Sequence, residues 1–443
     1  MNRWTQSISS LLALFGSVLV AGAFAAEVPP AFAYVPPIEQ PPESTDSQLT
    51  LAEASRLALV DQPVLLGREA MIEAEQHQAI AAAQLPDPKL SGGLKDLPID
   101  TGEALSVRRD NFTEFAVGLS QEFPRAEKRR LKGERLGQGA DVDRAALDND
   151  RRAIGRDTSL AWLDVYEAEQ ALKLTKALQG EAELQVQALL KEYSAGKASQ
   201  ADWFAAKIDS ELVGDKAHDW LHHALRSRDM LARWIGEDAK RPIADSPDLP
   251  VLPSALPPLI ERADHHPVIN GLDRRIDVSA TDIALAHQAY KPDFSVELYT
   301  AYRPNYADFV GLQFTVGLPY FTKNRQDRDL SAALEQARAA KERKRDVLRE
   351  LHAQVNENYV DWQHYAQRVA DFDSVILPDA EHRLAAARST YGAGSGSLEA
   401  VLLARRSLLD VKLQRLALSM EAARAQVRLD YLTASNPSSG DAP

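Results

Sequence analysis

Two stretches of the chain alternate between apolar and polar or small residues, which is the pattern of a β-strand with one apolar and one polar face. From Phe309 to Leu318 every second residue is apolar, and Thr113 to Phe123 repeats the pattern. A shorter stretch before each of them supplies the partner strand of a hairpin. The sequence therefore predicts four strands, at about residues 88–96, 112–123, 293–302 and 309–318. Each is close to the ~9–11 residues that cross a bilayer when tilted.

After the proline that follows each second strand, the apolar spacing changes from two to the three and four of a coiled coil. The last helix shows this most clearly, with apolar residues at 409, 413, 416, 420, 423 and 427. Long helices are predicted at about 125–191 and 323–389, each roughly 100 Å long at about 1.5 Å per residue. Glycines interrupt the apolar pattern of the first long helix, so the sequence supports its continuity less than that of the second.

Three landmarks occur twice along the chain, in the same order and at nearly constant separation. They are Leu85–Asp87 against Lys291–Asp293, the strand that precedes a proline, and Tyr193–Gly196 against Tyr391–Gly394. The chain is therefore predicted to be a duplicated unit of helix, strand, strand, long helix and helix. The first repeat is placed at 47–238 with its turn at 193–199, the second at 259–434 with its turn at 391–397, and a linker at 239–258.

The ends of the chain differ from the repeats in composition. Arg3, the apolar run from Leu11 to Ala25 and the small-residue pattern at 23–25 predict a signal peptide at 1–25. Residues 26–46 are rich in proline and predict an extended linker, and 435–443 predict a disordered tail.

A membrane location requires the strands, because no later stretch of ~18 consecutive apolar residues is present. Four strands cannot close a barrel, since the smallest single-chain membrane barrels use about eight. An open sheet edge in lipid would leave backbone groups without hydrogen bonds. The chain is therefore predicted to oligomerise in order to insert.

Composition excludes several classes of function. The chain has no cysteine, which excludes disulfides and thiolate chemistry. Its formal net charge of -13 argues against nucleic acid as a partner. No catalytic triad motif, P-loop, GxGxxG or HExxH pattern is present, so the sequence predicts neither an enzyme nor a cofactor.

Histidines are the main candidates for a metal site, although Asp215 and Asp219 could join a weak one. His218, His222 and His223 share a predicted helix, and a spacing of four can present two imidazoles to one ion. No third ligand lies nearby in the sequence, so we expect a solvated helix face instead. His265 and His266, beside a proline at a helix boundary, receive the same interpretation, and no metal site is predicted.

Taken together, the duplication, the strand Gly118–Pro124 and the two Tyr-x-x-Gly turns resemble the TolC-type outer-membrane efflux proteins over essentially all of the mature length. The resemblance implies a mainly α fold with a small transmembrane β part. In that family three chains form a twelve-stranded β-barrel, continued across the periplasm by an α-helical barrel. Leu85–Leu90 and Asp96–Asp100 resemble the CzcC-like heavy-metal efflux branch.

The resemblance also implies roles for particular residues. The turns would be the periplasmic tips that contact an adaptor protein, through Gly196, Lys197, Ala198, Gly394, Ser395 and Gly396. Relatives carry carboxylates beyond the turns that ring the periplasmic entrance. Asp202 matches one of these, but Ala400 and Leu403 occupy the second set of positions, where Glu399 could supply the charge.

The function predicted from the sequence is a passive, gated outer-membrane channel subunit of a tripartite efflux system, with heavy-metal ions as the suggested cargo. Its expected partners are a periplasmic adaptor (membrane fusion) protein, an inner-membrane pump of the RND type, two further copies in a homotrimer, and outer-membrane lipid. The expected location is the outer membrane, with the helical barrel in the periplasm. Type I protein secretion and drug efflux are alternatives, as is a periplasmic coiled-coil scaffold.

Overall fold

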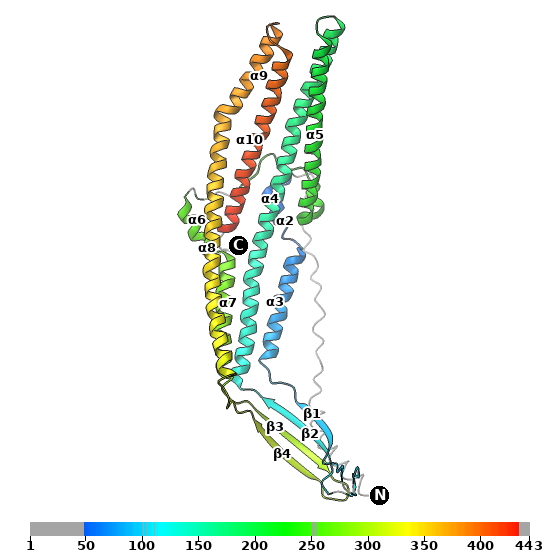
Figure 1. Ribbon diagram of the computed structural model, residues 1–443, viewed down its shortest axis with the longest axis vertical. Coiled ribbons are helices and arrows are strands. Elements are labelled where there is room, and N and C mark those ends of the chain that lie inside the picture. Colours follow the sequence, from blue (N-terminus) through cyan, green and yellow to red (C-terminus); the bar gives the residue numbers. More distant parts are fainter. Residues whose placement is uncertain are drawn as a thin grey trace. The chain divides into compact units, whose positions relative to one another are not determined.

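The structure is a computed structural model, and it describes residues 48–433 except 101, 103, 110, 250–252 and 254. The predicted signal peptide, N-terminal linker and C-terminal tail lie outside the described residues. Within these residues a sheet adjoins a set of long helices, and two helical hairpins end at the opposite side from the sheet (Figure 1).

Each repeat contains two short helices, a strand pair and a long helical hairpin, so the predicted mainly α fold with a duplicated unit is confirmed. The first repeat consists of α2 (Leu51–Leu57), α3 (Pro63–Ala82), β1 (Lys89–Lys95), β2 (Glu114–Phe123), α4 (Ala126–Ser194) and α5 (Gln200–Ile235), followed by a 3-10 helix at Gly236–Lys240. The second consists of α6 (Leu256–Ala263), α7 (Pro267–Gln288), β3 (Phe294–Tyr302), β4 (Phe309–Val316), α8 (Gln326–Asp371), a π-helical turn (Phe372–Ile376), α9 (Leu377–Gly392) and α10 (Leu398–Thr433).

The strands form one antiparallel sheet in the order β1-β2-β3-β4, so β1 and β4 are its edges within the described residues. The central pairing joins the repeats, with Leu119 opposite Leu298 and Phe123 opposite Phe294. Because the register aligns apolar with apolar positions, the alternation of each strand continues across the sheet.

The main hydrophobic core surrounds the middle of α4. Trp162 is fully buried there, and its indole nitrogen donates a hydrogen bond of 3.0 Å to the carbonyl oxygen of Leu49. Leu49 pairs with Ile243 in an isolated parallel bridge, and Ala239 is buried in the same core. The segment 239–258, predicted as a linker, therefore contributes its first part to the core as well as joining the repeats.

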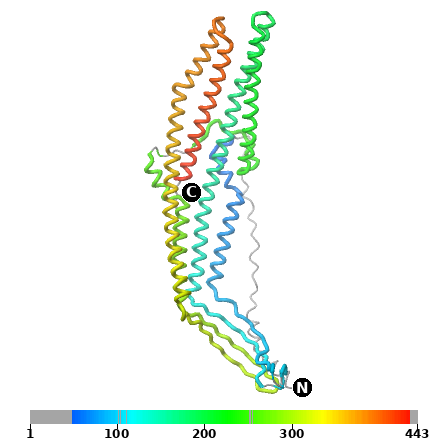
Figure 2. Tube along the Cα trace, in the orientation of Figure 1, coloured from blue at the N-terminus to red at the C-terminus, as the bar shows by residue number. Residues whose placement is uncertain are grey.

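The sequence favoured an unbroken helix in the second repeat more than in the first, and the structure shows the reverse. The glycine-containing α4 runs unbroken for 69 residues, whereas the predicted helix at 323–389 is divided by the π-helical turn at Phe372–Ile376 (Figure 2 traces both). The amide of Leu377 donates to the carbonyl of Phe372, five residues back. Among the described residues, no helix combines the length and the apolar composition that crossing a membrane would require.

Candidate functional site

One face of the sheet is apolar and exposed. Leu90 of β1, Val117 of β2, Leu298 of β3 and Phe314 of β4 lie on this face, and their exposed fractions range from 44% to 74%. Monomeric soluble proteins rarely expose so continuous an apolar surface, which indicates a contact with lipid or protein.

The opposite face of the sheet is polar. Lys89 pairs with Glu122, and Lys95 lies 3.9 Å from Glu114, both between β1 and β2. Glu297 of β3 accepts a hydrogen bond of 3.3 Å from the hydroxyl of Ser91. One sheet therefore separates an apolar from a charged environment.

On the polar face, side chains of β3 lie directly over two glycines of the neighbouring strands. A Cβ added at Gly118 would lie 2.5 Å from a carboxylate oxygen of Glu297, and one at Gly311 would overlap the ring of Tyr299. The side chains of β3 therefore lie across both neighbouring strands.

The junction between sheet and helices depends on Asp293, which belongs to a repeated sequence landmark. Its carboxylate accepts a hydrogen bond of 3.0 Å from the backbone amide of Arg125 and pairs with Lys128 at 2.5 Å. The start of β3 is thereby attached to the start of α4, one repeat to the other. The same contacts help to hold the pKa of Asp293 below its usual value, against the opposing effect of its desolvation, which is the largest single influence.

Both helical hairpins reverse through the same backbone motif. Gly196 after α4 has φ +72°, and Gly394 after α9 has φ +75°. Each glycine amide donates to the carbonyl three residues back at 2.9 Å, and the next amide, of Lys197 or Ser395, donates to the carbonyl five residues back. This is a Schellman motif, in which positive φ favours glycine. The glycine conformation inferred from the sequence is present at both tips.

Gly396 is constrained by space instead. A Cβ there would lie 2.7 Å from the hydroxyl of Thr390 and 3.0 Å from the amide nitrogen of Tyr391. The second tip therefore needs two glycines, for two different reasons.

The predicted tip residues are exposed except for Ala198. Ala198 and Trp203 pack against a small cluster that includes Leu189 of the first hairpin and Leu398 and Leu402 of the second. Ala198 is therefore half-buried between the two hairpins, and its predicted role as an adaptor contact stays a prediction.

The predicted entrance carboxylates both lie in the first turn of a helix. Asp202 completes a capping box on α5, in which it accepts from the Ser199 hydroxyl at 2.6 Å. Glu399 lies in the first turn of α10, whose Ala400 amide donates to the Ser397 hydroxyl at 3.2 Å. Carboxylates are favoured at helix N-termini, so each has a structural role whether or not it attracts cations.

The two tips come close to each other at Tyr391. Burial raises the pKa of Tyr391, and the carboxylates of Glu192 and Asp202 raise it further. A second link lies farther along, where Arg388 of α9 pairs with Glu181 of α4 at 2.6 Å. The hairpins of the two repeats are therefore connected near their ends.

A buried charge cluster strengthens this connection, and the sequence analysis did not identify it. Asp209 of α5 is fully buried and accepts from Arg405 of α10 at 2.7 Å, while Arg406 bonds its other oxygen. Arg405 is itself only 2% exposed. Arg405 interrupts the apolar spacing of Leu402 and Leu409, and a charge in such a position indicates a buried partner.

The histidines fall into two groups. No group of residues able to hold a metal ion occurs among the described residues, and this includes the helix that carries His218, His222 and His223. The interpretation of His266 as solvated is wrong, because its side chain is fully buried and accepts a hydrogen bond from the Val268 amide at the start of α7. Burial, with the nearby charge of Arg152, lowers the pKa of His266 to about 4.

Comparisons with known proteins agree with this architecture. Residues 264–435, which lie almost wholly in the second repeat, match the model of a family described as outer membrane efflux protein. A sequence comparison with curated proteins gave no match.

Solved structures share the fold over most of the chain. A membrane protein from Pseudomonas aeruginosa aligns with a TM-score of 0.73 at 19% identity, covering 86% of this chain and 92% of that one. CusC, described in connection with transmembrane channel formation, gives 0.75 at 16%, covering 88% and 94%. The outer membrane channel CmeC of Campylobacter jejuni gives 0.72 at 14%, covering 86% and 85%.

The family match over residues 264–435 and the shared fold bear out the resemblance to TolC-type outer-membrane efflux proteins, and the matched family is described as an outer-membrane one. The matched family is described as one of efflux proteins, and the descriptions of CusC and CmeC both refer to a channel.

Proposed function

We propose that the chain is one subunit of a homotrimeric, passive efflux channel that crosses the outer membrane through a shared barrel and reaches into the periplasm with its helices. The observation that carries this proposal is the sheet. Its apolar face suits lipid, its charged face suits water, and both of its edge strands are free of strand partners within the described residues. Further copies would supply those partners and remove the open edges.

The tips are proposed to dock a periplasmic adaptor that couples the channel to an inner-membrane pump of the RND type. Gly196, Lys197, Gly394, Ser395 and Gly396 are exposed there, on a backbone fixed by the two Schellman motifs. A rigid turn that presents small residues supports a close protein contact, because little conformational freedom is lost on binding. Asp202 and Glu399 remain candidates for negative charge at the entrance.

Heavy-metal ions are the proposed cargo, on the strength of the CzcC-like segments at 85–90 and 96–100. The channel would only conduct them, since no metal-binding cluster occurs in the part of the chain that the structure describes. Drug efflux and protein secretion use the same architecture, so cargo tolerance of a deletion strain complemented with this chain decides between them.

A matched pair of substitutions on β4 tests the membrane assignment. Phe314→Arg places a charge on the apolar face at a cost of about 2–4 kcal/mol near the bilayer midplane. Gln313→Arg points to the polar face, where Glu297 lies directly opposite on β3. We expect Phe314→Arg to reduce the SDS-resistant trimer in outer-membrane fractions and Gln313→Arg to leave it unchanged. Equal effects, or recovery of the unaltered protein in the soluble periplasmic fraction, would contradict the proposal.

A further inference from the structure

The charged residues on the polar face of the sheet do not cancel. The strands contain two lysines and three glutamates, and the register places all five on this face. Lys89 pairs with Glu122, and Lys95 lies 3.9 Å from Glu114. Glu297 of β3 has no ion pair within the described residues. Each subunit therefore carries one unmatched negative charge on the polar face.

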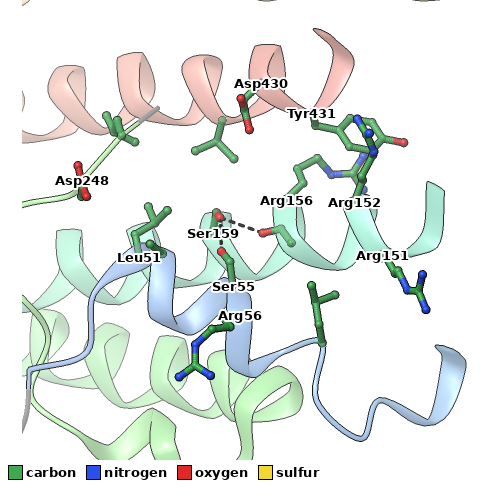
Figure 3. Close-up of a pocket in the computed structure, with 15 residues that line it drawn as sticks. Leu51, Ser55, Arg56, Arg151, Arg152, Arg156, Ser159, Asp248, Asp430 and Tyr431 are labelled. Carbon is green, nitrogen blue, oxygen red and sulfur yellow. Dashed lines mark hydrogen bonds between the residues drawn. The ribbon is translucent and has the colours of Figure 1, made fainter. Parts of the chain in front are cut away.

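The charges around a pocket between α2, α4 and α10 differ in this respect (Figure 3). Arg152 and Arg156 lie there beside Tyr431. Arg156 pairs with Asp157 at 2.7 Å, and its guanidinium lies 4.3 Å from the centre of the Tyr431 ring. Arg152 also has a partner. These arginines are satisfied within the fold, whereas Glu297 keeps its charge available to solutes in front of the sheet.

The side chain of Glu297 lies along the sheet instead of standing away from it. It crosses β2 above Gly118, where a Cβ would lie 2.5 Å from its Oε1 atom. The same oxygen accepts a hydrogen bond of 3.3 Å from the hydroxyl of Ser91 on β1. Tyr299 lies over Gly311 of β4 in the same manner. The glycines thus let β3 place a charge and a ring at the wall while the space in front of the sheet stays open.

We infer that Glu297 makes the lumen of the proposed barrel favour cations over anions. The inference rests on the proposed function, in which three copies close a barrel around the polar face. Threefold symmetry then places three Glu297 side chains at one level of the lumen, and rings of carboxylates favour cations in channels. Asp202 and Glu399 lie beyond the helical tips, so Glu297 acts at a separate place, inside the barrel.

The size of the effect follows from the dimensions of the barrel. Twelve strands about 4.8 Å apart, tilted by about 40°, form a wall about 12 Å from the axis. The three carboxylates then lie about 10 Å from the axis, close to the Debye length in about 0.1 M salt. Screened attraction by three charges raises the ratio of monovalent cations to anions on the axis about fivefold. In about 1 M salt the Debye length is about 3 Å and the ratio approaches one.

Ion selectivity in planar lipid bilayers tests the inference, with the purified mature trimer and a gradient of potassium chloride around 0.1 M. The reversal potential gives the permeability ratio of potassium over chloride. We expect Glu297→Gln to lower this ratio about fivefold and Glu297→Asp to retain most of it. In about 1 M salt the difference should disappear. The matched control is Glu237→Gln, the same chemical change in the 3-10 helix away from the sheet, which should leave the ratio unchanged.

Chemical restoration of the charge completes the design, because the chain has no cysteine of its own. An anionic methanethiosulfonate reagent should restore the ratio in Glu297→Cys, and a cationic one should lower it further. Equal ratios in Glu297→Gln and the unaltered protein, equal loss in Glu237→Gln, or the same effect of both reagents would overturn the inference but not the channel. If Glu297→Gln forms no SDS-resistant trimer, the two reagents on Glu297→Cys decide. No conductance by the unaltered protein would overturn the proposed channel and this inference with it.

Discussion

The two repeats share an element order but differ in their long helices. α4 contains five glycines and is unbroken from Ala126 to Ser194, whereas the counterpart in the second repeat has no glycine between 326 and 391 and still changes to a π-helical turn. The difference follows from Pro378, which lacks an amide proton and whose ring would clash with the carbonyl of Ser374 in a regular α-helix. Glycine weakens a helix without removing a hydrogen bond, so packing along α4 is enough to maintain it.

The second repeat therefore has a joint where the first has a continuous rod. An ion pair crosses this joint, with Arg415 of α10 donating to both oxygens of Asp373 at 2.9 and 3.0 Å. Both partners are partly exposed, so the pair contributes at most about 1 kcal/mol. This ion pair with α10 therefore stabilises the π-helical turn only weakly.

The largest loss of stability is expected when the ion pair between the two repeats at Asp209 is removed. Asp209→Ala leaves Arg405 buried without its carboxylate, and we expect the free energy of unfolding to fall by about 3–5 kcal/mol. Urea unfolding followed by far-UV circular dichroism measures the change. The control is Asp410→Ala, which removes an exposed pair with Lys216 between the same helices and should cost about 0–1 kcal/mol. Similar small losses in both variants would show that the cluster does not hold the hairpins together.

Exchanging proline between the repeats tests the cause of the joint. Gly180→Pro should interrupt α4 and cost about 3 kcal/mol, whereas Gly180→Ala should gain about 0.5–1 kcal/mol. In the second repeat, Pro378→Ala supplies the missing amide. We expect slower hydrogen exchange across 372–380, measured by mass spectrometry. Unchanged exchange there would mean that Pro378 does not cause the π-helical turn.

Low pH should destabilise the start of α7 but not the start of its equivalent in the first repeat, α3. Both begin with proline, but Gln62 before α3 makes no side-chain cap, whereas His266 caps α7. The folded pKa of His266, about 4, lies below its unfolded value of about 6.5, so the unfolded state binds more protons between these values. The contribution of His266 to the free energy of unfolding is therefore complete above about pH 6.5. It decreases by up to about 3 kcal/mol as the pH falls toward 4.

The variant His266→Asn isolates this contribution, because asparagine can cap the helix without titrating in this range. We expect its unfolding free energy to vary less between pH 6.5 and 4 than that of the unaltered protein. Parallel pH profiles of the two proteins would assign the acid sensitivity to carboxylates elsewhere.

The smallest effect on stability is expected at the tips, where the repeats are most alike. Gly394→Trp and Gly196→Trp each place a side chain at positive φ, at a cost of about 1–2 kcal/mol. Membrane insertion and trimer formation should persist, while adaptor cross-linking and export should fail, with Lys341→Trp on the exposed side of α8 as the control. Normal cross-linking in both tip variants would remove the docking role, and loss of the trimer would show that these glycines serve folding.

Local patterns predicted much of this structure. The strands begin and end within two residues of the predicted ranges, because alternation such as that from Phe309 onward depends only on neighbours in the chain. The tip conformation was equally accessible, since Gly196 and Gly394 each follow a helical pattern.

Features that depend on contacts between distant segments were not predictable. The pairing of Asp209 with Arg405 joins residues that are far apart in the sequence, and the burial of His266 depends on Tyr431, whose ring packs against it. The π-helical turn could not be predicted for a different reason. Pro378 is evident in the sequence, but a proline can either end a helix or be accommodated by a local change in its hydrogen bonding, and the sequence does not decide between these outcomes.

The edges of the sheet determine how a single subunit behaves before it meets others. β1 carries Lys89 and Lys95 near its ends, and lysine on an edge strand discourages unwanted pairing, whereas β4 has no charged residue. Two copies of β1 repel each other, and an uncharged β4 fits a β1 better than its own copy. For the proposed trimeric channel, a lone subunit would be an intermediate that is consumed by collisions with other subunits. The yield of inserted channel should then rise more steeply than linearly with the rate of synthesis of the chain.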